Sequence, residues 1–284
     1  MIQSLATQHP VCRLCRLLDV SPSGYYQWRK HLPGPRAQAN DALCQHLKRA
    51  FALNRQTYGS PRLTRCLQRQ HIPCSENRVA RLMRQQHLQA RSKRPFRPRT
   101  TDSRQAQGTA PNRLKTLGPL TRINQVWVAD ITYIHTHSGW AYLAAVMDRF
   151  SRKIVGWTLG YTLHGFLVRD ALQHALARRQ PAPGLIHHSD QGKQYASGTF
   201  LSLLQTWQIT PSMSTRGNCY DNAAMESFWS TLKTELVHRC SFRDLPHASA
   251  VISHYIEHFY NPKRLHSALG YHSPVDFERI TNHE

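Results

Sequence analysis

Three acidic residues lie in sequence contexts that favour chemistry over a surface role. Asp130 interrupts the strand-like segment WVADITY, where an acid is unusual unless it is paired or binds a metal. Asp190 directly follows the short apolar segment LIHH, at the end of an expected strand where open sheets bind ligands. Glu226 lies in NAAMESFW, which predicts a helix. The gaps between the three acids are 59 and 35 residues.

Carboxylates of this kind suit divalent metal ions if the fold brings them together. Mg²⁺ prefers octahedral oxygen ligands and keeps several waters, so a few carboxylates and a substrate phosphate complete its shell. Two ions about 3.5–4 Å apart can activate the attacking oxygen of a phosphodiester reaction and stabilise the leaving oxygen. Without metal the clustered charges repel, and the pKa of at least one acid rises. The alternative is three unrelated surface acids.

Lys233 lies seven residues after Glu226 on the same expected helix, so the two side chains point the same way. A cation there could hold the DNA backbone beside the acids, and a solvated helix face is the alternative. Two further acids, Asp148 and Asp221, are explained by turn and helix-cap roles and are left out of the candidate site.

The elements that must position these residues begin near Gln125. Apolar alternation predicts three consecutive strands, in VWVADITYI, WAYLAAVMD and KIVGWTL. A helix over 163–179, the strand LIHH, a helix over 195–207, the short strand ITPSM and the helix NAAMESFWSTLKTELV follow. This order predicts an α/β fold with a mixed five-stranded sheet and helices on both faces, over residues 123–284.

The first part of the chain, residues 1–90, reads as an all-α helix-turn-helix region. Two short helices are expected over 11–30, and a third from Asp41. A further pair follows, one opened by Pro61 and one capped by Ser75. On the last of these helices, an apolar face opposes a face formed by Arg78, Arg81 and Gln85. That arrangement predicts a helix that reads the major groove, and a solvated face on an ordinary helix is the alternative.

Charge is distributed very unevenly along the 284 residues. Residues 1–122 hold 23 Lys and Arg against 4 Asp and Glu, whereas residues 123–284 hold 14 against 12. A cationic half joined to a nearly neutral half indicates one part that binds a polyanion and another with a different task. A basic surface serving only solubility, or one that binds anionic membranes, remains an alternative.

The segment 91–122 carries nine basic residues and four prolines, and it predicts a flexible basic linker. The seven cysteines are odd in number and scattered, which argues against a disulfide framework. Cys12 and Cys15 form a single CxxC inside an apolar helical run without a second pair of ligands, so zinc is disfavoured there. No apolar stretch is long enough to span a membrane and no secretion signal is present, so we expect a cytoplasmic protein.

Several of these segments occur together in one superfamily. In chain order they are YGSPRLTRCL, WVADITY, HSDQG, NAAMESFW, YNPKRLH and HSALGYHSP. Together they resemble the DDE transposase and retroviral-integrase superfamily, and within it the second-frame (OrfB) product of the insertion-sequence-three family. The resemblance covers nearly the whole chain.

The resemblance implies a ribonuclease-H-like core and a transposase that cuts and joins DNA strands at the ends of an insertion sequence. It implies two Mg²⁺ (or Mn²⁺) ions held by the three acids, with Asp130 bridging both. It also implies a basic residue at Lys233, and it makes Arg264 in YNPKRLH a candidate DNA-binding residue.

The implied partners are double-stranded DNA, as terminal inverted repeats and as target, and further copies of the chain assembled on that DNA. The family's complete enzyme carries an upstream helix-turn-helix and leucine zipper, and no heptad repeat precedes residue 20 here. The resemblance therefore also implies a partner or fusion with the upstream-frame product.

Three other functions compete with this interpretation. A retroelement integrase would need two His before two Cys, but only His9 precedes Cys12 and Cys15. A DNA-binding regulator with an inactive core is disfavoured because all three acids are present. An RNA–DNA hybrid nuclease would leave the basic helical region unexplained.

Overall fold

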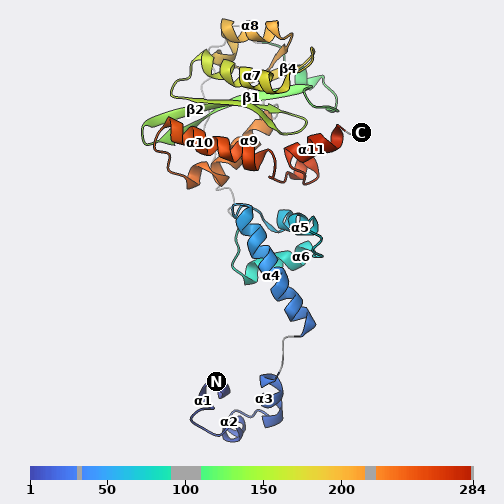
Figure 1. Cartoon of the computed structure of the whole chain (residues 1–284), viewed down its shortest axis with the longest axis vertical. Coiled ribbons are helices and arrows are strands. Elements are labelled where there is room, and N and C mark those ends of the chain that lie inside the picture. Colours follow the sequence, from blue (N-terminus) through green and yellow to red (C-terminus); the bar gives the residue numbers. More distant parts are fainter. Residues whose placement is uncertain (31–33, 91–109, 215–221, 283–284) are drawn as a thin grey trace. The chain divides into compact units, whose positions relative to one another are not determined.

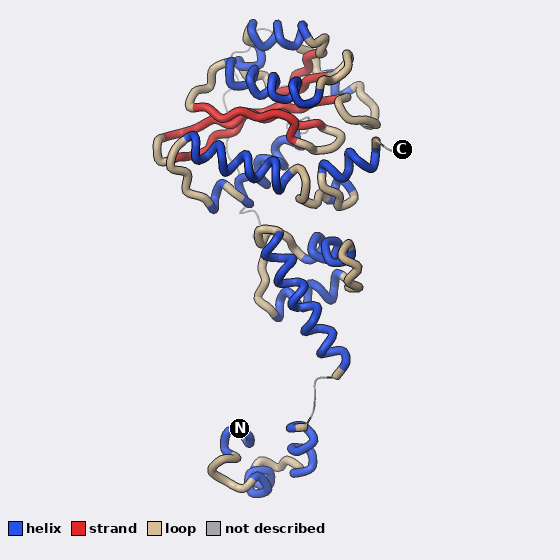
Figure 2. The backbone as a smooth tube through the Cα atoms, in the orientation of Figure 1, coloured by secondary structure: helices blue, strands red, loops and turns tan. Residues whose placement is uncertain are grey.

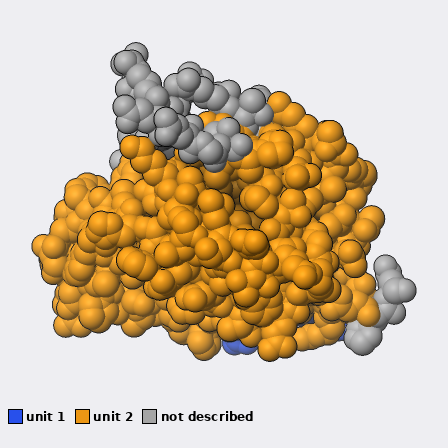
Figure 3. Space-filling view, turned by 90° about the horizontal axis from the view of Figure 1, so that it is seen from above, with its two compact units in different colours: residues 1–53, 59–89 blue, residues 54–58, 90–284 orange. Residues whose placement is uncertain are grey.

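The computed structural model describes residues 1–30, 34–90, 110–214 and 222–282 (Figure 1). Two compact units, coloured separately in Figure 3, make up the chain. Unit 1 contains Met1–Leu53 and Gly59–Gln89, and unit 2 contains Asn54–Tyr58 and Ala90–Glu284. Most of the expected basic linker, residues 91–109, lies outside the described residues, and so does Asp221.

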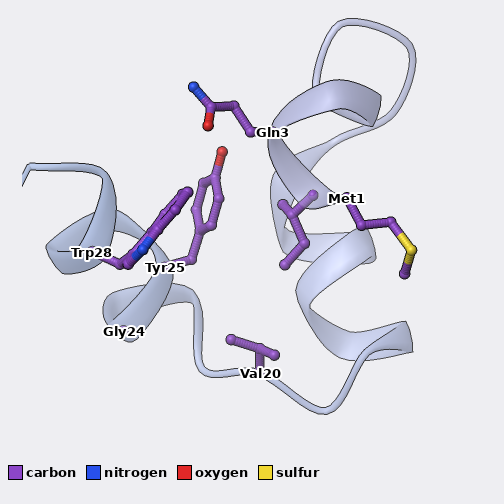
Figure 4. Close-up of a pocket in the computed structure, with 7 residues that line it drawn as sticks. Met1, Gln3, Val20, Gly24, Tyr25 and Trp28 are labelled. Carbon is purple, nitrogen blue, oxygen red and sulfur yellow. The ribbon is translucent and has the colours of Figure 1, made fainter. Parts of the chain in front are cut away.

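Unit 1 begins with three short helices, α1 (Ile2–Leu5), α2 (Val11–Leu17) and α3 (Pro22–Arg29). Ser21 caps α3 by accepting a hydrogen bond from the backbone N–H of Gly24 at 2.9 Å. The two helices expected over 11–30 are present, and α1 is an addition too short for a sequence pattern to reveal. In Figure 4, Tyr25 and Trp28 lie on one side of a pocket and the helix that begins beside Met1 lies on the other.

The rest of unit 1 is formed by α4 (Pro35–Leu53), α5 (Ser60–Gln68) and α6 (Glu76–Gln85). Their buried apolar side chains form the interface among the three helices: Leu43, Leu47, Phe51, Leu63, Leu67, Val79, Leu82 and Met83. Ser75 caps α6, as the sequence predicts, by accepting from the N–H of Arg78. The expected start of α4 at Asp41 is wrong, because the helix already begins at Pro35.

Unit 2 is built on five strands: β1 (Val126–Thr136), β2 (Gly139–Asp148), β3 (Ile154–Gly160), β4 (Ile186–Ser189) and β5 (Thr210–Met213). They lie in the order β3-β2-β1-β4-β5. The pairs β1–β2 and β2–β3 are antiparallel, whereas β1–β4 and β4–β5 are parallel. The mixed five-stranded sheet expected from the sequence is thereby confirmed.

Helices cover both faces of this sheet (Figures 1 and 2). On one face lie α7 (Gly165–Arg179) and α8 (Gly198–Thr206), and on the other lie α9 (Ala223–Glu235) and α10 (Leu245–Tyr255). The buried side chains of α7 and α8 share one core with the strands, around Trp127 and Leu172. At Gly156 an added Cβ would lie 2.2 Å from the carbonyl oxygen of Ala171, so only glycine lets α7 approach β3 this closely.

Short helical segments complete unit 2: η1 (Arg113–Lys115), η2 (Lys193–Ala196), η4 (Val237–Arg239), the π-helical η5 (Ile256–Tyr260), η6 (Ser267–Leu269) and α11 (Pro274–Thr281). The side chain of Asn261 bonds both the N–H and the carbonyl of Ile154, which ties the end of η5 to β3. Within the described ranges, no helix has both the length and the apolar character that crossing a membrane requires.

Two details define the limits of unit 2. The backbone N–H of Arg113 donates to Ser212 on β5, so chain that the sequence assigns to the linker already packs on the sheet. The hydroxyl of Tyr58 accepts from the N–H of Leu265 at 2.7 Å and is fully buried. The link between α4 and α5 is thereby anchored within unit 2.

Candidate active site

Asp130 lies on β1, just beyond the point where the pairing of β1 with β4 ends. Val126–Val128 pair with β4, and among the described residues no strand pairs with β1 beyond Val128 on that side. Asp130 therefore lies just past the end of the short strand β4, at an open edge of the sheet. Its carboxylate accepts two hydrogen bonds, from the N–H of Ile131 at 2.8 Å and from the indole N–H of Trp229 at 3.0 Å.

The electrostatic environment of Asp130 is that of a clustered acid. Burial, followed by the charge of Asp190, raises the pKa of Asp130 from 3.8 to about 7, and Glu226 adds a smaller effect of the same sign. The hydrogen bonds from Ile131 and Trp229 oppose this rise. The fold thus brings the three acids predicted from the sequence into one electrostatic environment.

Asp190 follows β4 in a tight turn. Its Oδ1 accepts from the N–H of Gly192 at 3.1 Å, and a Cβ at Gly192 would lie 3.0 Å from that same oxygen. Burial raises the pKa of Asp190, although the Gly192 hydrogen bond opposes the shift. Next to this turn, His188 bonds Ser212 at 2.9 Å and Ser214 at 3.0 Å, which fixes the end of β4 against the β5 segment.

Glu226 lies in the first turn of α9, which packs on β1, and it is exposed to solvent. In the parts of the chain that the structure describes, no three His, Cys, Asp or Glu side chains are grouped closely enough to hold an ion. The three acids thus interact electrostatically, but their side chains do not form a complete set of ligands for a metal ion.

Two residues near the acids could not be assigned from the sequence. The indole of Trp229, only 6% exposed, donates to Asp130 from one turn beyond Glu226. The hydroxyl of Tyr195 is buried and has no hydrogen-bond partner among the described atoms, and the charges of Asp130 and Asp190 raise its pKa further beyond the effect of burial. Nothing in the local sequence distinguishes either ring from a core aromatic.

Replacing Trp229 with Phe tests whether the indole positions Asp130. The variant keeps an aromatic ring but loses the donor. For a carboxylate that binds a metal ion, loss of such an outer hydrogen bond costs about 10–100-fold in activity or metal affinity. Since that bond lowers the pKa of Asp130, its loss should shift the acid limb of the pH–rate profile to higher pH. Reaction rates at several pH values measure both effects, and a uniform loss with an unmoved profile would leave only a packing role.

Lys233 lies on α9 with its ammonium 4.7 Å from the ring centre of Tyr133. Burial lowers the pKa of Lys233, and the nearby charge of Asp130 opposes that shift. The lysine therefore lies near Asp130 and Tyr133.

The three residues of α6 that the sequence predicts to read DNA differ in their exposure to solvent. Gln85 is exposed, whereas Arg78 and Arg81 are half-buried. Arg78 donates through Nε to Asn40 on α4 at 3.0 Å, and Nε of Arg81 is buried without a partner among the described atoms. Both arginine side chains are therefore only partly accessible to solvent.

Arg264 lies where a DNA contact is not available. It is 5% exposed and forms a bidentate ion pair with Glu235, with N–O distances between 2.7 and 3.1 Å. The hydroxyl of Tyr255 donates to the same carboxylate at 2.8 Å. This burial corrects the expectation that Arg264 binds DNA, because its guanidinium is paired with Glu235 inside unit 2.

Three protein-family models match the chain. A model described as "Integrase core domain" matches residues 121–219, and a second with the same description matches 207–274. A model described as "HTH-like domain" matches residues 38–96. The two core matches together include all three acids.

Similar proteins extend over nearly the full chain. An "Insertion element IS600 uncharacterized 31 kDa protein" from Shigella sonnei is 42% identical, over 93% of this chain and 97% of its own length. A "Transposase for insertion sequence element IS904" from Lactococcus lactis is 40% identical, over 88% and 98%. "Transposase InsF for insertion sequence IS3A" from Escherichia coli is 37% identical, over 98% and 96%.

Among solved structures, the catalytic core domain of HTLV-2 integrase in complex with magnesium is similar at 14% identity and a TM-score of 0.43. The similarity covers 55% of this chain and 97% of that one.

Proposed function

This chain belongs to the insertion-sequence-three family of transposases, and from that premise we propose that Asp130, Asp190 and Glu226 form its catalytic site. The chain is a transposase with an integrase core, a polynucleotidyl transferase acting in DNA transposition. The observation that carries the proposal is the placement of the acids. Asp130 lies just past the end of β4, which Asp190 directly follows, and Trp229, one turn beyond Glu226 on α9, donates to Asp130.

The three carboxylates fit Mg²⁺ (or Mn²⁺), because they are hard oxygen donors whose mutual repulsion a cation would relieve. We propose two ions per site, which when bound activate the attacking oxygen and stabilise the leaving oxygen of the phosphodiester. The chain's own residues orient the donors. Trp229 holds one oxygen of Asp130, and the N–H of Gly192 holds Asp190.

Lys233 fits a role in holding the DNA backbone. Its ammonium lies beside Asp130 but forms no ion pair with it within 4.0 Å, so its charge is free to attract a phosphate next to the acids. We place it in contact with the strand that reacts.

Binding and chemistry divide along the chain in this proposal. Residues 1–90 read the terminal inverted repeats, 91–122 form a basic connection, and 123–284 carry the catalytic core. The +19 net charge of residues 1–122 supports this division, because affinity for DNA follows local positive charge. Gln85, Arg78 and Arg81 are the candidate reading residues on α6.

We further propose that several copies assemble on the two ends and the target DNA, together with or fused to the upstream-frame product. A protein whose substrate is the bacterial chromosome acts in the cytoplasm, at the nucleoid.

A strand-cleavage assay with labelled DNA from the flanking terminal repeat tests this function. In Mg²⁺ the full chain should nick and join at the repeat end, and removing the metal with a chelator should stop both reactions. The full chain carrying Arg78→Ala and Arg81→Ala should lose about 10²-fold of its end preference, because each side chain that contacts a base edge contributes about 1–3 kcal/mol.

The matched control is random-sequence DNA of equal length at several salt concentrations, since phosphate contacts weaken alike on all sequences. Unchanged end-specific binding by that double variant would contradict the division. Cleavage that persists after chelation would contradict the metal site.

A further inference from the structure

Exposed aromatic side chains gather on the hairpin that follows Asp130. Tyr133 on β1 and Trp140 on β2 are each 53% exposed, and their ring centres lie 5.4 Å apart at 82°. His135, also exposed, lies directly across from Trp140 in the register, with ring centres 5.1 Å apart. We call Tyr133, His135 and Trp140 the hairpin ring cluster.

The hairpin ring cluster differs from ordinary exposed apolar residues because its rings lie together and next to a lysine. Large aromatic side chains rarely remain half exposed together unless they contact a partner. Lys233, on the helix of Glu226, places its ammonium 4.7 Å from the Tyr133 ring. A cation among exposed rings is the combination by which proteins bind single-stranded nucleic acid.

The cluster and Asp130 lie on opposite faces of the sheet, next to the same open edge of β1. Three residues along β1 correspond to about 10 Å, the rise of about three stacked nucleotides. Residues at odd spacing point to opposite faces of a strand, so Asp130 faces α9 whereas Tyr133 faces away from it. Beyond Val128 no described strand pairs with this edge of β1, and Lys233 reaches Tyr133 there.

A DNA duplex follows that path only at a cost. Its persistence length is about 150 base pairs, and a sharp bend costs about 1–6 kcal/mol. One unpaired nucleotide can do so, because rotation about its backbone moves the base away from the phosphate.

We propose that the hairpin ring cluster stacks an unpaired base of the reacting DNA strand, next to the phosphate that the three acids act on. This subsite rests on the proposed function. Stacking on these rings replaces the stacking that the base loses on leaving the duplex, and it holds the frayed end in place. Sequence preference is not required, because every base has a face that can stack.

The experiment compares two versions of a terminal-repeat duplex that is mispaired at the nucleotides beside the scissile phosphate. The intact version carries all its bases, and the abasic version lacks the bases of the reacting strand at those nucleotides. Since a mispaired base costs least to extrude from the duplex, its stacking on the rings adds to the affinity. Binding is measured by fluorescence anisotropy without divalent metal, so that no strand is cut. Wild-type protein should bind the intact DNA about tenfold more tightly than the abasic DNA, the size expected for one stacked base. The variant carrying both Tyr133→Ala and Trp140→Ala should bind the two DNAs equally.

The abasic DNA also controls for folding, because the double variant should bind it as wild-type protein does. Phe166→Ala removes an exposed aromatic side chain on α7, outside the cluster, and should keep the tenfold difference. A double variant that keeps the difference would overturn the proposal, and so would an equal loss of affinity for both DNAs. Since no cleavage is measured, this result is independent of whether the three acids are catalytic.

Discussion

Replacing Asp130 or Asp190 with Asn, or Glu226 with Gln, is expected to lower DNA cleavage and joining by on the order of 10³-fold. The amide keeps the size of the side chain but removes its charge, so the remaining two acids hold a divalent ion poorly. A catalytic metal ion contributes several kcal/mol to the transition state, and each 1.36 kcal/mol corresponds to a factor of ten in rate.

DNA binding should change little in the same variants, since the positive charge that attracts DNA lies mainly in residues 1–122. For Asp130→Asn, loss of a repelled half-buried carboxylate should leave unit 2 as stable as before, or more stable at neutral pH. Its raised folded-state pKa means that the ionised acid costs stability above the ordinary pKa of 3.8. Gel-based strand-transfer assays and anisotropy titrations measure the two properties separately.

The matched control is Asp170→Asn, which removes an acid of α7 that forms an ion pair with its neighbour Arg169. That variant should cleave and join as wild-type protein does. Normal joining by any one of the three active-site variants would remove that residue from the proposed site.

The sheet and the acids were predictable because their signals are local. Apolar alternation marks β1, β2 and β3, and each of the two aspartates is placed by the strand that contains or precedes it. The start of α4 was not predictable in the same way. Asp41 has the side chain expected of a helix cap, but the helix begins at Pro35, because proline at the first turn of a helix loses no hydrogen bond.

The contacts that surround the acids depend on residues far apart in the chain. Trp229 and Asp130 are 99 residues apart, and only the packing of α9 on β1 brings them together. The same limit applies to Arg264, whose partner Glu235 lies 29 residues away. An arginine in a basic DNA-binding protein is readily assigned to DNA, because its sequence neighbours do not reveal an acid on another helix.

Breaking the buried pair of Glu235 and Arg264 should destabilise unit 2 by about 3–5 kcal/mol, because the partner that remains is an uncompensated charge. Both side chains are about 5% exposed. Burial alone would lower the pKa of Arg264, but the carboxylate of Glu235 outweighs that effect and raises it. Arg264→Ala should show the full loss, and Arg264→Lys much of it, because an ammonium cannot form the bidentate contact.

The double variant with Glu235→Leu and Arg264→Met separates this structural role from DNA binding. It removes both charges together, so it should be more stable than either single variant, although the hydroxyl of Tyr255 loses its acceptor. Urea unfolding of each variant, followed by tryptophan fluorescence, gives the free energies. DNA affinity per folded molecule should equal that of wild-type protein throughout. A stable Arg264→Ala variant with weakened DNA binding would instead mean that the guanidinium leaves Glu235 to contact DNA.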